Sequence, residues 1–187
     1  MNIKSTPLSG VVLIEPTVFG DRRGFFKEGW NRKKFAELGL QLDFVQDNVS
    51  LSRQGILRGL HFQNPNPQGK LVHALQGEVF DVAVDIRRGS PTFGQWFGQR
   101  LSAENHLQLY IPEGFAHGFC VLSETALFAY KCTDFYDPRA EHCLRWDDPD
   151  IGIDWPLNRP PILSAKDEVA YRLREMPEEF LPIYSEE

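Results

Sequence analysis

The segment ILRGLHFQ places one histidine, His61, in an otherwise apolar run, three residues after Arg58. A neutral imidazole can bind a metal ion, occupy a hydrogen-bonded core position or act as a general base, because it titrates near neutral pH. This segment alone leaves all three roles open. The other residues able to do chemistry must decide among them.

A second histidine, His117 in PEGFAHGF, makes the sequence similar to cupins, whose metal site uses an H-x-H pair, a glutamate and a later histidine. Here Gln63 takes the second position of H-x-H, and only Asp81 or Asp85 could add a carboxylate. Transition metals bound by nitrogen and carboxylate need three or more ligands on one side of the ion. We therefore expect no metal centre.

The elements that must position these residues are mostly β-strands. Short apolar or alternating runs are separated by Gly, Pro, Asn and Asp, a spacing typical of an all-β sandwich or barrel. In EVFDVAVDIR one face is apolar and the other is mixed, so we expect the mixed face to line a pocket. The expected strands cover residues 11–16, 24–30, 44–52, 58–63, 70–76, 78–87, 95–102, 106–112, 117–123, 126–133 and 142–146.

Two segments break the strand pattern and predict short helices. Residues 31–40 open on Asn31 as an N-cap and reach a glycine at Gly39. Residues 164–176, SAKDEVAYRLREM, open with the S-x-x-D pattern of a helix start. No repeat, low-complexity tract or linker divides the chain. We expect a single domain over residues 1–187, folded as an all-β, cupin-type jelly-roll β-barrel with a few short peripheral helices.

The composition excludes several classes of protein. With 42% hydrophobic and 25% charged residues, the 187-residue chain has the make-up of a soluble globular protein. A formal net charge of −6 without a basic block argues against nucleic-acid and anionic-membrane partners. The start MNIKSTPLSG has no apolar signal region and no segment approaches the ~18 apolar residues of a membrane span, so we expect a cytoplasmic protein. Three cysteines without CxxC spacing indicate buried thiols.

Seven segments in the same order resemble the dTDP-4-dehydrorhamnose 3,5-epimerases of the cupin superfamily. The resemblance implies a jelly-roll homodimer with an exchanged N-terminal strand. It also implies an enzyme that inverts C3 and C5 of dTDP-4-keto-6-deoxyglucose without a cofactor, on the route to dTDP-L-rhamnose. The segments are FGDRRGFFKE, FVQDNVSLS, ILRGLHFQ, QGKLVHALQGEVFDVAVDIRRGSPTFGQW, LSAENHLQLYIPEGFAHGF, YKCTDFY and LSAKD.

The resemblance assigns four residues to the chemistry. Inverting a carbon beside a ketone needs a base, a group that stabilises the enolate oxygen, and an acid on the opposite face. His61 fits the base, with Asp167 on its other nitrogen. Tyr130 fits the acid and Lys70 the cation beside the C4 oxygen. The default alternatives are helix capping for Asp167, packing for Tyr130 and a solvated strand end for Lys70.

The resemblance also points to residues that hold the nucleotide. Guanidinium and ammonium groups suit a diphosphate, and an aromatic ring, Tyr136, is expected to stack on thymine. Arg23 is expected to act across the dimer, although Arg22 beside it leaves the register open. Each of these could instead be an ordinary rim residue. The expected substrate contacts are Arg23, Glu28, Gln46, Asp47, Asn48, Arg58, Lys70, His117, Tyr136, Glu141 and Lys166.

Two positions carry geometric expectations. Strict alternation puts Arg58 and His61 on opposite faces of a strand, yet the implied mechanism needs both in one pocket. We therefore expect either a bulge at Gly59 or an Arg58 that still lies in the entry loop. His73 stands where close family members are expected to carry arginine, and alternation from Lys70 turns it away from the pocket.

Three alternatives to the double epimerase stay open at this point. A related enzyme could invert only one carbon or isomerise the keto-sugar of another dTDP sugar. A jelly roll could bind sugars without catalysis. A cupin oxygenase would need a metal ion.

Overall fold

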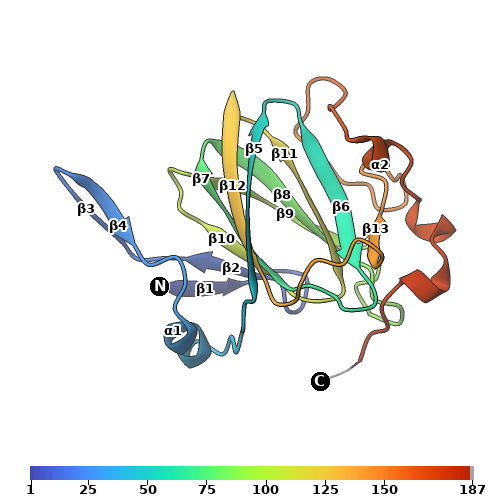
Figure 1. The fold of residues 1–187 in the computed structure, drawn as a ribbon, viewed down its shortest axis with the longest axis horizontal. Helices are drawn as coiled ribbons and strands as arrows, with labels where there is room; N and C mark the ends of the chain where they lie inside the picture. Colours follow the sequence, from blue (N-terminus) through green and yellow to red (C-terminus); the bar gives the residue numbers. More distant parts are fainter. Residues whose placement is uncertain (186–187) are drawn as a thin grey trace.

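Two antiparallel sheets face each other in the computed structural model, which describes residues 1–185 (Figure 1). One sheet has the strand order β1-β2-β10-β7-β12-β5 and the other has the order β13-β6-β11-β8-β9, while β3 and β4 form a separate hairpin. The strands are β1 (Asn2–Ser5), β2 (Val12–Glu15), β3 (Val18–Asp21), β4 (Gly24–Lys27), β5 (Gln46–Arg53), β6 (Leu57–Gln63), β7 (Lys70–Gln76), β8 (Glu78–Asp85), β9 (Trp96–Ser102), β10 (Gln108–Ile111), β11 (Phe115–Val121), β12 (Thr125–Cys132) and β13 (Glu141–Cys143).

The expected fold class is confirmed. Each strand predicted from hydrophobic patterning is present to within a few residues, whereas β1 and β3 were not expected. Both of these four-residue strands are too short to show a clear period, and each is defined by its partner, β2 or β4. Helices are few and short: α1 (Arg32–Glu37), α2 (Ala165–Glu168) and the 3₁₀ turns η1 (Leu173–Glu175) and η2 (Glu178–Phe180).

Strand β8 explains where the core lies. Val79 and Ala83, on the mixed face that was expected to line a pocket, instead pack in the core between the two sheets, and no residue of β8 lines the cavity between the sheets. The other face, which carries Val82 and Val84, is not solvated either, because the C-terminal segment covers it and contributes Leu173 among other apolar residues. In Figure 1 this segment runs beside β6 and β13. Both faces of β8 are therefore buried, and its polar residues must find partners inside the protein.

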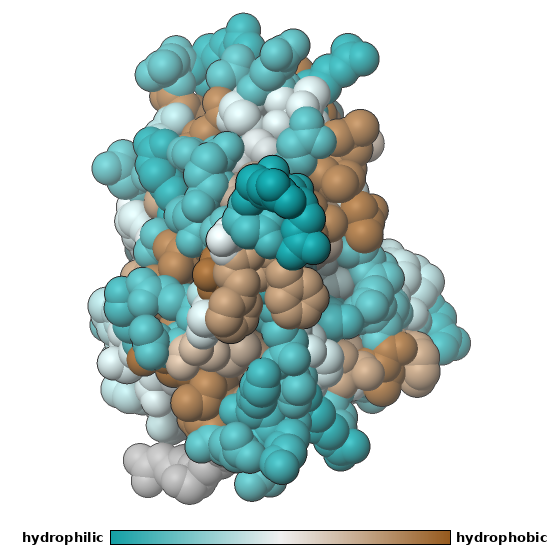
Figure 2. Space-filling view, turned by 90° about the vertical axis from the view of Figure 1, so that its left-hand side faces the viewer, coloured by the Kyte–Doolittle hydropathy of each residue, from teal (hydrophilic) through white to brown (hydrophobic). Residues whose placement is uncertain are grey.

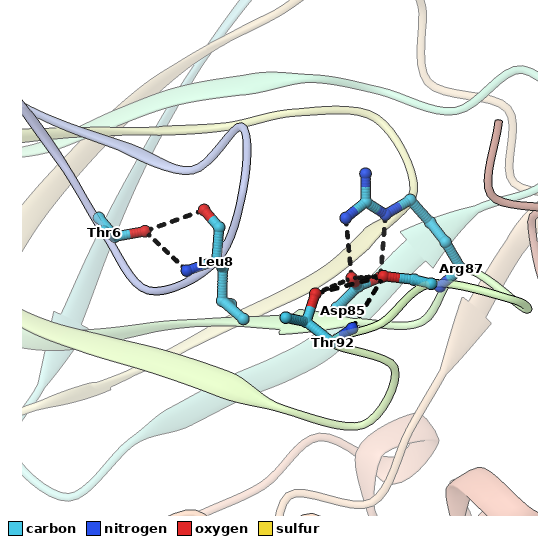
Figure 3. A network of polar contacts seen from close by, with 6 residues as sticks. Thr6, Leu8, Asp85, Arg87 and Thr92 are labelled. Carbon is cyan, nitrogen blue, oxygen red and sulfur yellow. Dashed lines mark hydrogen bonds and ion pairs between the residues drawn. The ribbon is translucent and has the colours of Figure 1, made fainter. Parts of the chain in front are cut away.

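Asp85 shows how one buried carboxylate at the end of β8 is satisfied (Figure 3). Its Oδ1 accepts from Arg87 Nε at 2.9 Å, and its Oδ2 accepts from Ser90 Oγ at 2.5 Å and Thr92 Oγ1 at 2.6 Å. Burial alone would raise the pKa of Asp85, but these hydrogen bonds hold it below its ordinary value. A separate turn in the same view, where Thr6 bonds to the backbone of Leu8, closes the start of the chain against the core.

The β3–β4 hairpin projects away from the two sheets (Figure 1), and its aromatic side chains are exposed. Phe19, Phe25 and Phe26 are 60–67% exposed, and Val49 and Leu51 on the outer face of β5 are exposed to a similar degree. Figure 2 looks toward the hairpin and shows apolar residues gathered beside a hydrophilic projection. This is more apolar exposure than scattered surface residues explain.

The two predicted helices have different outcomes. Helix α1 is confirmed, and the Asn31 side chain caps it by accepting from Lys34 N at 3.2 Å. The expectation of one helix over residues 164–176 is wrong, because α2 ends at Glu168. The Tyr171 carbonyl instead accepts from Arg145 N at 2.8 Å, which ties this backbone to the segment after β13. A tertiary backbone contact thus overrides a local helical pattern.

Candidate active site

A cavity of about 570 Å³ opens between the two sheets. Strands β5, β7 and β12 contribute side chains from one sheet, β6, β11 and β13 from the other, and the segment around α2 closes one side. Most of the residues expected from the sequence line it. These are Gln46, Asn48, Arg58, His61, Lys70, His117, Tyr130, Tyr136, Glu141, Lys166 and Asp167.

His61 and Asp167 form a close pair although 106 residues separate them. His61 Nε2 lies 2.6 Å from Asp167 Oδ1, and the Asp167 side chain is only 2% exposed. The other carboxylate oxygen, Oδ2, accepts from Ser164 Oγ at 2.6 Å, and the same hydroxyl accepts from Asp167 N at 3.4 Å as the cap of α2. Asp167 is therefore both a histidine partner and part of a helix cap.

Burial and this pairing set the charge of the two groups. Burial lowers the pKa of His61 below its ordinary value, and the Asp167 carboxylate only partly offsets that effect. Burial would raise the pKa of Asp167, but the hydrogen bonds from His61 and Ser164 hold it below its ordinary value. A neutral imidazole beside an ionised carboxylate is the protonation state that a general base requires near neutral pH. Since Nε2 faces Asp167, Nδ1 is the ring nitrogen left for a substrate.

A bulge at Gly59 brings Arg58 and His61 into one pocket. In the pairing of β6 with β11, His61 stands opposite His117 and Arg58 opposite Phe119, so two residues of β6 face the single Gly118 of β11. Both Arg58 and His61 line the cavity. The expected bulge is confirmed, and the alternative entry-loop position of Arg58 is wrong because Arg58 lies within β6.

The facing sheet supplies a phenol and an ammonium group. Tyr130 on β12 and Lys70 on β7 line the cavity opposite His61. Burial raises the pKa of Tyr130, so its hydroxyl holds its proton at neutral pH. Burial lowers the pKa of Lys70, which indicates an ammonium with little water around it. Such a group stabilises nearby negative charge more strongly than a solvated lysine does.

The cupin metal ligands do not fit this pocket. His117 Nε2 lies 2.8 Å from Asp81 Oδ2, so the two imidazoles each direct Nε2 at a different carboxylate. Gln63, at the second position of H-x-H, hydrogen-bonds to backbone groups through its side-chain amide. Its Nε2 donates to Asn66 O at 2.8 Å and its Oε1 accepts from Asp137 N. In this arrangement His61, His117 and Gln63 point at separate protein partners and do not converge on one ion as the cupin ligands do.

The rim of the pocket carries an ion pair between Lys166 and Glu141, to which Tyr136 also bonds. Lys166 Nζ donates to Glu141 Oε1 at 2.7 Å, and Tyr136 Oη donates to Glu141 Oε2 at 2.9 Å. Burial would raise the pKa of Glu141, but the bonds from Lys166 and Tyr136 hold it below its ordinary value. A substrate anion that binds Lys166 must therefore compete with this carboxylate.

Three expected substrate contacts lie outside the cavity. Arg23 is at the hairpin tip, where its guanidinium binds Asp21, and Glu28 pairs with Lys34 at 2.9 Å. Asp47 lies on the outer face of β5, paired with Lys131 at 2.7 Å. These three side chains do not line this chain's own cavity, because strand alternation turns Asp47 outward and the hairpin carries Arg23 away. For Arg23 this agrees with the expectation that it acts across a dimer, which stays a prediction.

His73 also lies outside the cavity, as alternation from Lys70 indicates. Its pKa is lowered to about 4, first by burial and then by the nearby charges of Lys27 and Lys131.

The cavity includes residues that sequence reasoning missed. Ser164 was noted only as the first residue of S-x-x-D, although that pattern already predicts a hydroxyl close to Asp167. The others were not singled out, although all but Ile162 lie in segments that carry the family resemblance. Their place in the cavity depends on the packing of the two sheets and of the segment before α2. They are Ser50, Ile56, Leu57, Gln68, Phe119, Ile162 and Leu163.

Comparisons with known proteins agree with this geometry. A dTDP-4-dehydrorhamnose 3,5-epimerase of Pseudomonas aeruginosa is 61% identical over 88% of this chain and 93% of its own length. One from Salmonella typhimurium is 58% identical over 91% of this chain and 94% of its own length. The crystal structure of a dTDP-6-deoxy-D-glucose-3,5-epimerase from Legionella pneumophila, in complex with dTDP-4-keto-L-rhamnose, superposes with a TM-score of 0.97 at 54% identity and covers 99% of both chains.

An imidazole–carboxylate pair that faces a phenol across a pocket suits acid–base chemistry, and together with these relatives, which are named epimerases, it defines an enzyme of the isomerase class. The family model described as dTDP-4-dehydrorhamnose 3,5-epimerase matches residues 5–175. The chain belongs to this family.

Proposed function

We propose that this chain is a dTDP-4-dehydrorhamnose 3,5-epimerase, which inverts C3 and C5 of dTDP-4-keto-6-deoxyglucose in dTDP-L-rhamnose formation. The observation that carries the proposal is the 2.6 Å pair of His61 and Asp167 in a pocket faced by Tyr130. Membership of the family and the relatives' names support the same reaction.

His61 is the proposed base. A carbon beside the C4 ketone loses its proton to Nδ1, and the electron pair moves into an enolate whose oxygen carries the negative charge. The imidazolium that forms is stabilised by Asp167, which Ser164 holds in place by donating to the far carboxylate oxygen. The neutral form of His61 near pH 7 supports this assignment.

Tyr130 and Lys70 complete the proposed reaction. Lys70 stabilises the enolate oxygen, where an ammonium group in a water-poor pocket has its largest effect. Tyr130 returns a proton to the carbon from the face opposite His61, which inverts the centre. The placement of His61 on β6 and Tyr130 on β12, in facing sheets, supports attack and reprotonation from opposite sides of one sugar ring.

The nucleotide is proposed to bind at the rim. Arg58 and Lys166 supply cationic donors for the diphosphate, and Tyr136 offers a ring for thymine. Gln46, Asn48, Glu141 and His117 are the proposed polar contacts around the sugar and ribose. Because Lys166 is paired with Glu141, phosphate binding exchanges one anionic partner for another.

We propose that the protein works as a cytoplasmic homodimer with an exchanged N-terminal strand. The projecting hairpin and the exposed outer face of β5 support this, since both present apolar side chains that a second copy would cover. In such a dimer Arg23, Glu28 and Asp47 act at or near the partner's pocket rather than their own. We also propose that residues 1–187 form one domain. Within residues 1–185, no helix is long and apolar enough to cross a membrane.

The function is tested by incubating the purified protein with dTDP-4-keto-6-deoxyglucose and a downstream reductase in heavy water. We expect deuterium at both C3 and C5 of the product. Label at one carbon only identifies a single-carbon epimerase and overturns the double inversion. His61→Ala is expected to abolish turnover and leave nucleotide binding largely intact; full activity in that variant removes His61 as the base.

Whether Arg23 serves the pocket of the partner subunit is tested by mixing two inactive variants. Arg23→Ala and His61→Ala chains, refolded together in equal amounts, form heterodimers in half of the cases. Each heterodimer has one pocket with both groups intact if Arg23 serves the partner, so about one quarter of wild-type activity returns. No recovery means that Arg23 acts in its own chain, whereas full activity of Arg23→Ala alone means that Arg23 has no role in turnover.

A further inference from the structure

We propose that His61, Cys143 and Asp167 form a binding site for a thiophilic divalent metal ion such as Zn²⁺, and that occupation of this site inhibits the enzyme. The inhibition rests on the proposed role of His61, whereas the metal binding does not. The site differs from the cupin ligand set, with which it shares only His61.

Strand pairing brings the thiol to the imidazole. Cys143 is the residue of β13 directly opposite His61 of β6, and helix α2 adds Asp167 from the other side. Each of the three residues offers one ligand atom, and these atoms lie within 4.8 Å of one another. Asp167 is buried and the other two are partly buried, so the three side chains are already held in place by packing.

The three donors match the preference of zinc. Zn²⁺ takes imidazole nitrogen, thiolate sulfur and carboxylate oxygen, and three protein ligands with one open position are a common set. At metal–ligand distances of about 2.0–2.2 Å a tetrahedral ion would hold the nitrogen and oxygen about 3.3 Å apart. His61 Nε2 and Asp167 Oδ1 lie at 2.6 Å, so rotations that open the pair by about 0.7 Å admit the ion.

Binding would exchange a proton for the metal ion. The hydrogen on His61 Nε2 moves to Nδ1 when Nε2 becomes a ligand, so the imidazole stays neutral, and the proton that leaves is that of the Cys143 thiol as the metal–sulfur bond forms. No oxidant or reductant is needed. The ion then occupies the place of the hydrogen bond that orients the base, and its positive charge beside His61 opposes formation of an imidazolium.

The test uses ZnCl₂ for inhibition and CoCl₂ as a spectroscopic probe, on the full-length protein and on Cys143→Ala and Cys143→Ser. We expect Zn²⁺ at micromolar concentrations to reduce turnover of the wild type, relative to its own metal-free rate, with reversal by a chelator. Cys143→Ala should require at least about tenfold more Zn²⁺ for the same fractional inhibition, because one of three ligands is gone. Co²⁺ should give a thiolate-to-metal absorption band in the wild type and none in either variant.

Two results would overturn the proposal: equal sensitivity of the wild type and both Cys143 variants to Zn²⁺, or no Co²⁺–thiolate band in the wild type. The band is read without substrate. A band in a protein that has no epimerase activity would therefore refute the proposed function and leave the metal site standing.

Discussion

Replacing Asp167 with asparagine removes the charge from the His61 pair while keeping its shape. In the wild type, Ser164 Oγ donates to Oδ2 and Oδ1 faces His61 Nε2. In Asp167→Asn the acceptor oxygen stays with Ser164, so the amide NH₂ points at Nε2. Nε2 must then accept, which moves the ring proton to Nδ1, the nitrogen that faces the substrate. The variant thus presents a donor where the reaction needs a base.

The size of the effect follows from the loss of the carboxylate charge and from the change of the His61 tautomer. A hydrogen bond between the imidazolium and a carboxylate contributes about 1.5–3 kcal/mol, which corresponds to a loss of about 10- to 150-fold in rate. The wrong tautomer also prevents His61 from acting as a base, and a positioned general base contributes about 10²- to 10⁴-fold to the rate. We therefore expect kcat to fall by about 10²- to 10⁴-fold while nucleotide binding changes little.

The assay is the reductase-coupled reaction under saturating substrate, with nucleotide binding measured separately by calorimetry. Asp147→Asn is the matched control, since Asp147 is a carboxylate paired with Arg145 at 2.9 Å and lies outside the cavity. Thermal unfolding of both variants checks that each is folded. A kcat for Asp167→Asn within about threefold of the wild type would refute the role of this carboxylate.

Four further outcomes are expected. Tyr130→Phe should still exchange substrate hydrogen with heavy water but form product at least about 10²-fold more slowly, and undiminished product formation contradicts its role as acid. Because burial lowers the pKa of His61 from its ordinary value of 6.5, the midpoint of the acidic limb of the kcat/KM profile should lie below pH 6.5, with activity lost only as the pH drops through the lowered pKa. A midpoint above pH 6.5 would contradict this. Ser164→Gly keeps a tolerable helix cap but loses the hydroxyl donor to Asp167, so kcat should fall about tenfold or more with KM little changed, and Ser164→Thr should restore it. Gly59→Ala places a Cβ 2.6 Å from β11 backbone at a φ of +117°, so urea unfolding should show a loss of at least about 2 kcal/mol, and wild-type stability would contradict the close approach.

The sequence predicted the strands better than it predicted their partners. Alternation in β7 and β8 gave their limits closely, because each run is bounded by glycine, proline or a charged residue. It could not indicate that the second face of β8 is covered by residues as distant as Leu173, since that burial depends on the path of the C-terminal segment. The same path explains why residues 164–176 do not form one helix.

The candidate site shows the same division. The bulge at Gly59 was foreseen because a glycine between two residues needed in one pocket is a chemical signal in the sequence. The contact of His61 with Asp167 came only from family resemblance, since no periodic pattern links residues so far apart. Cys143 gave no signal at all, because its place beside His61 follows from the pairing of β13 with β6.

Gly59 and Gly118 approach each other at the bulge where β6 pairs with β11. A Cβ on Gly59 would lie 2.6 Å from Gly118 Cα, and a Cβ on Gly118 would lie 2.7 Å from the carbonyl oxygen of Arg58. Neither position can therefore accept a side chain while the other strand stays in place. A designer who transplants this acid–base site onto another jelly roll must carry both glycines along with Arg58 and His61, because the two residues without side chains are what allow the arginine and the histidine to share one pocket.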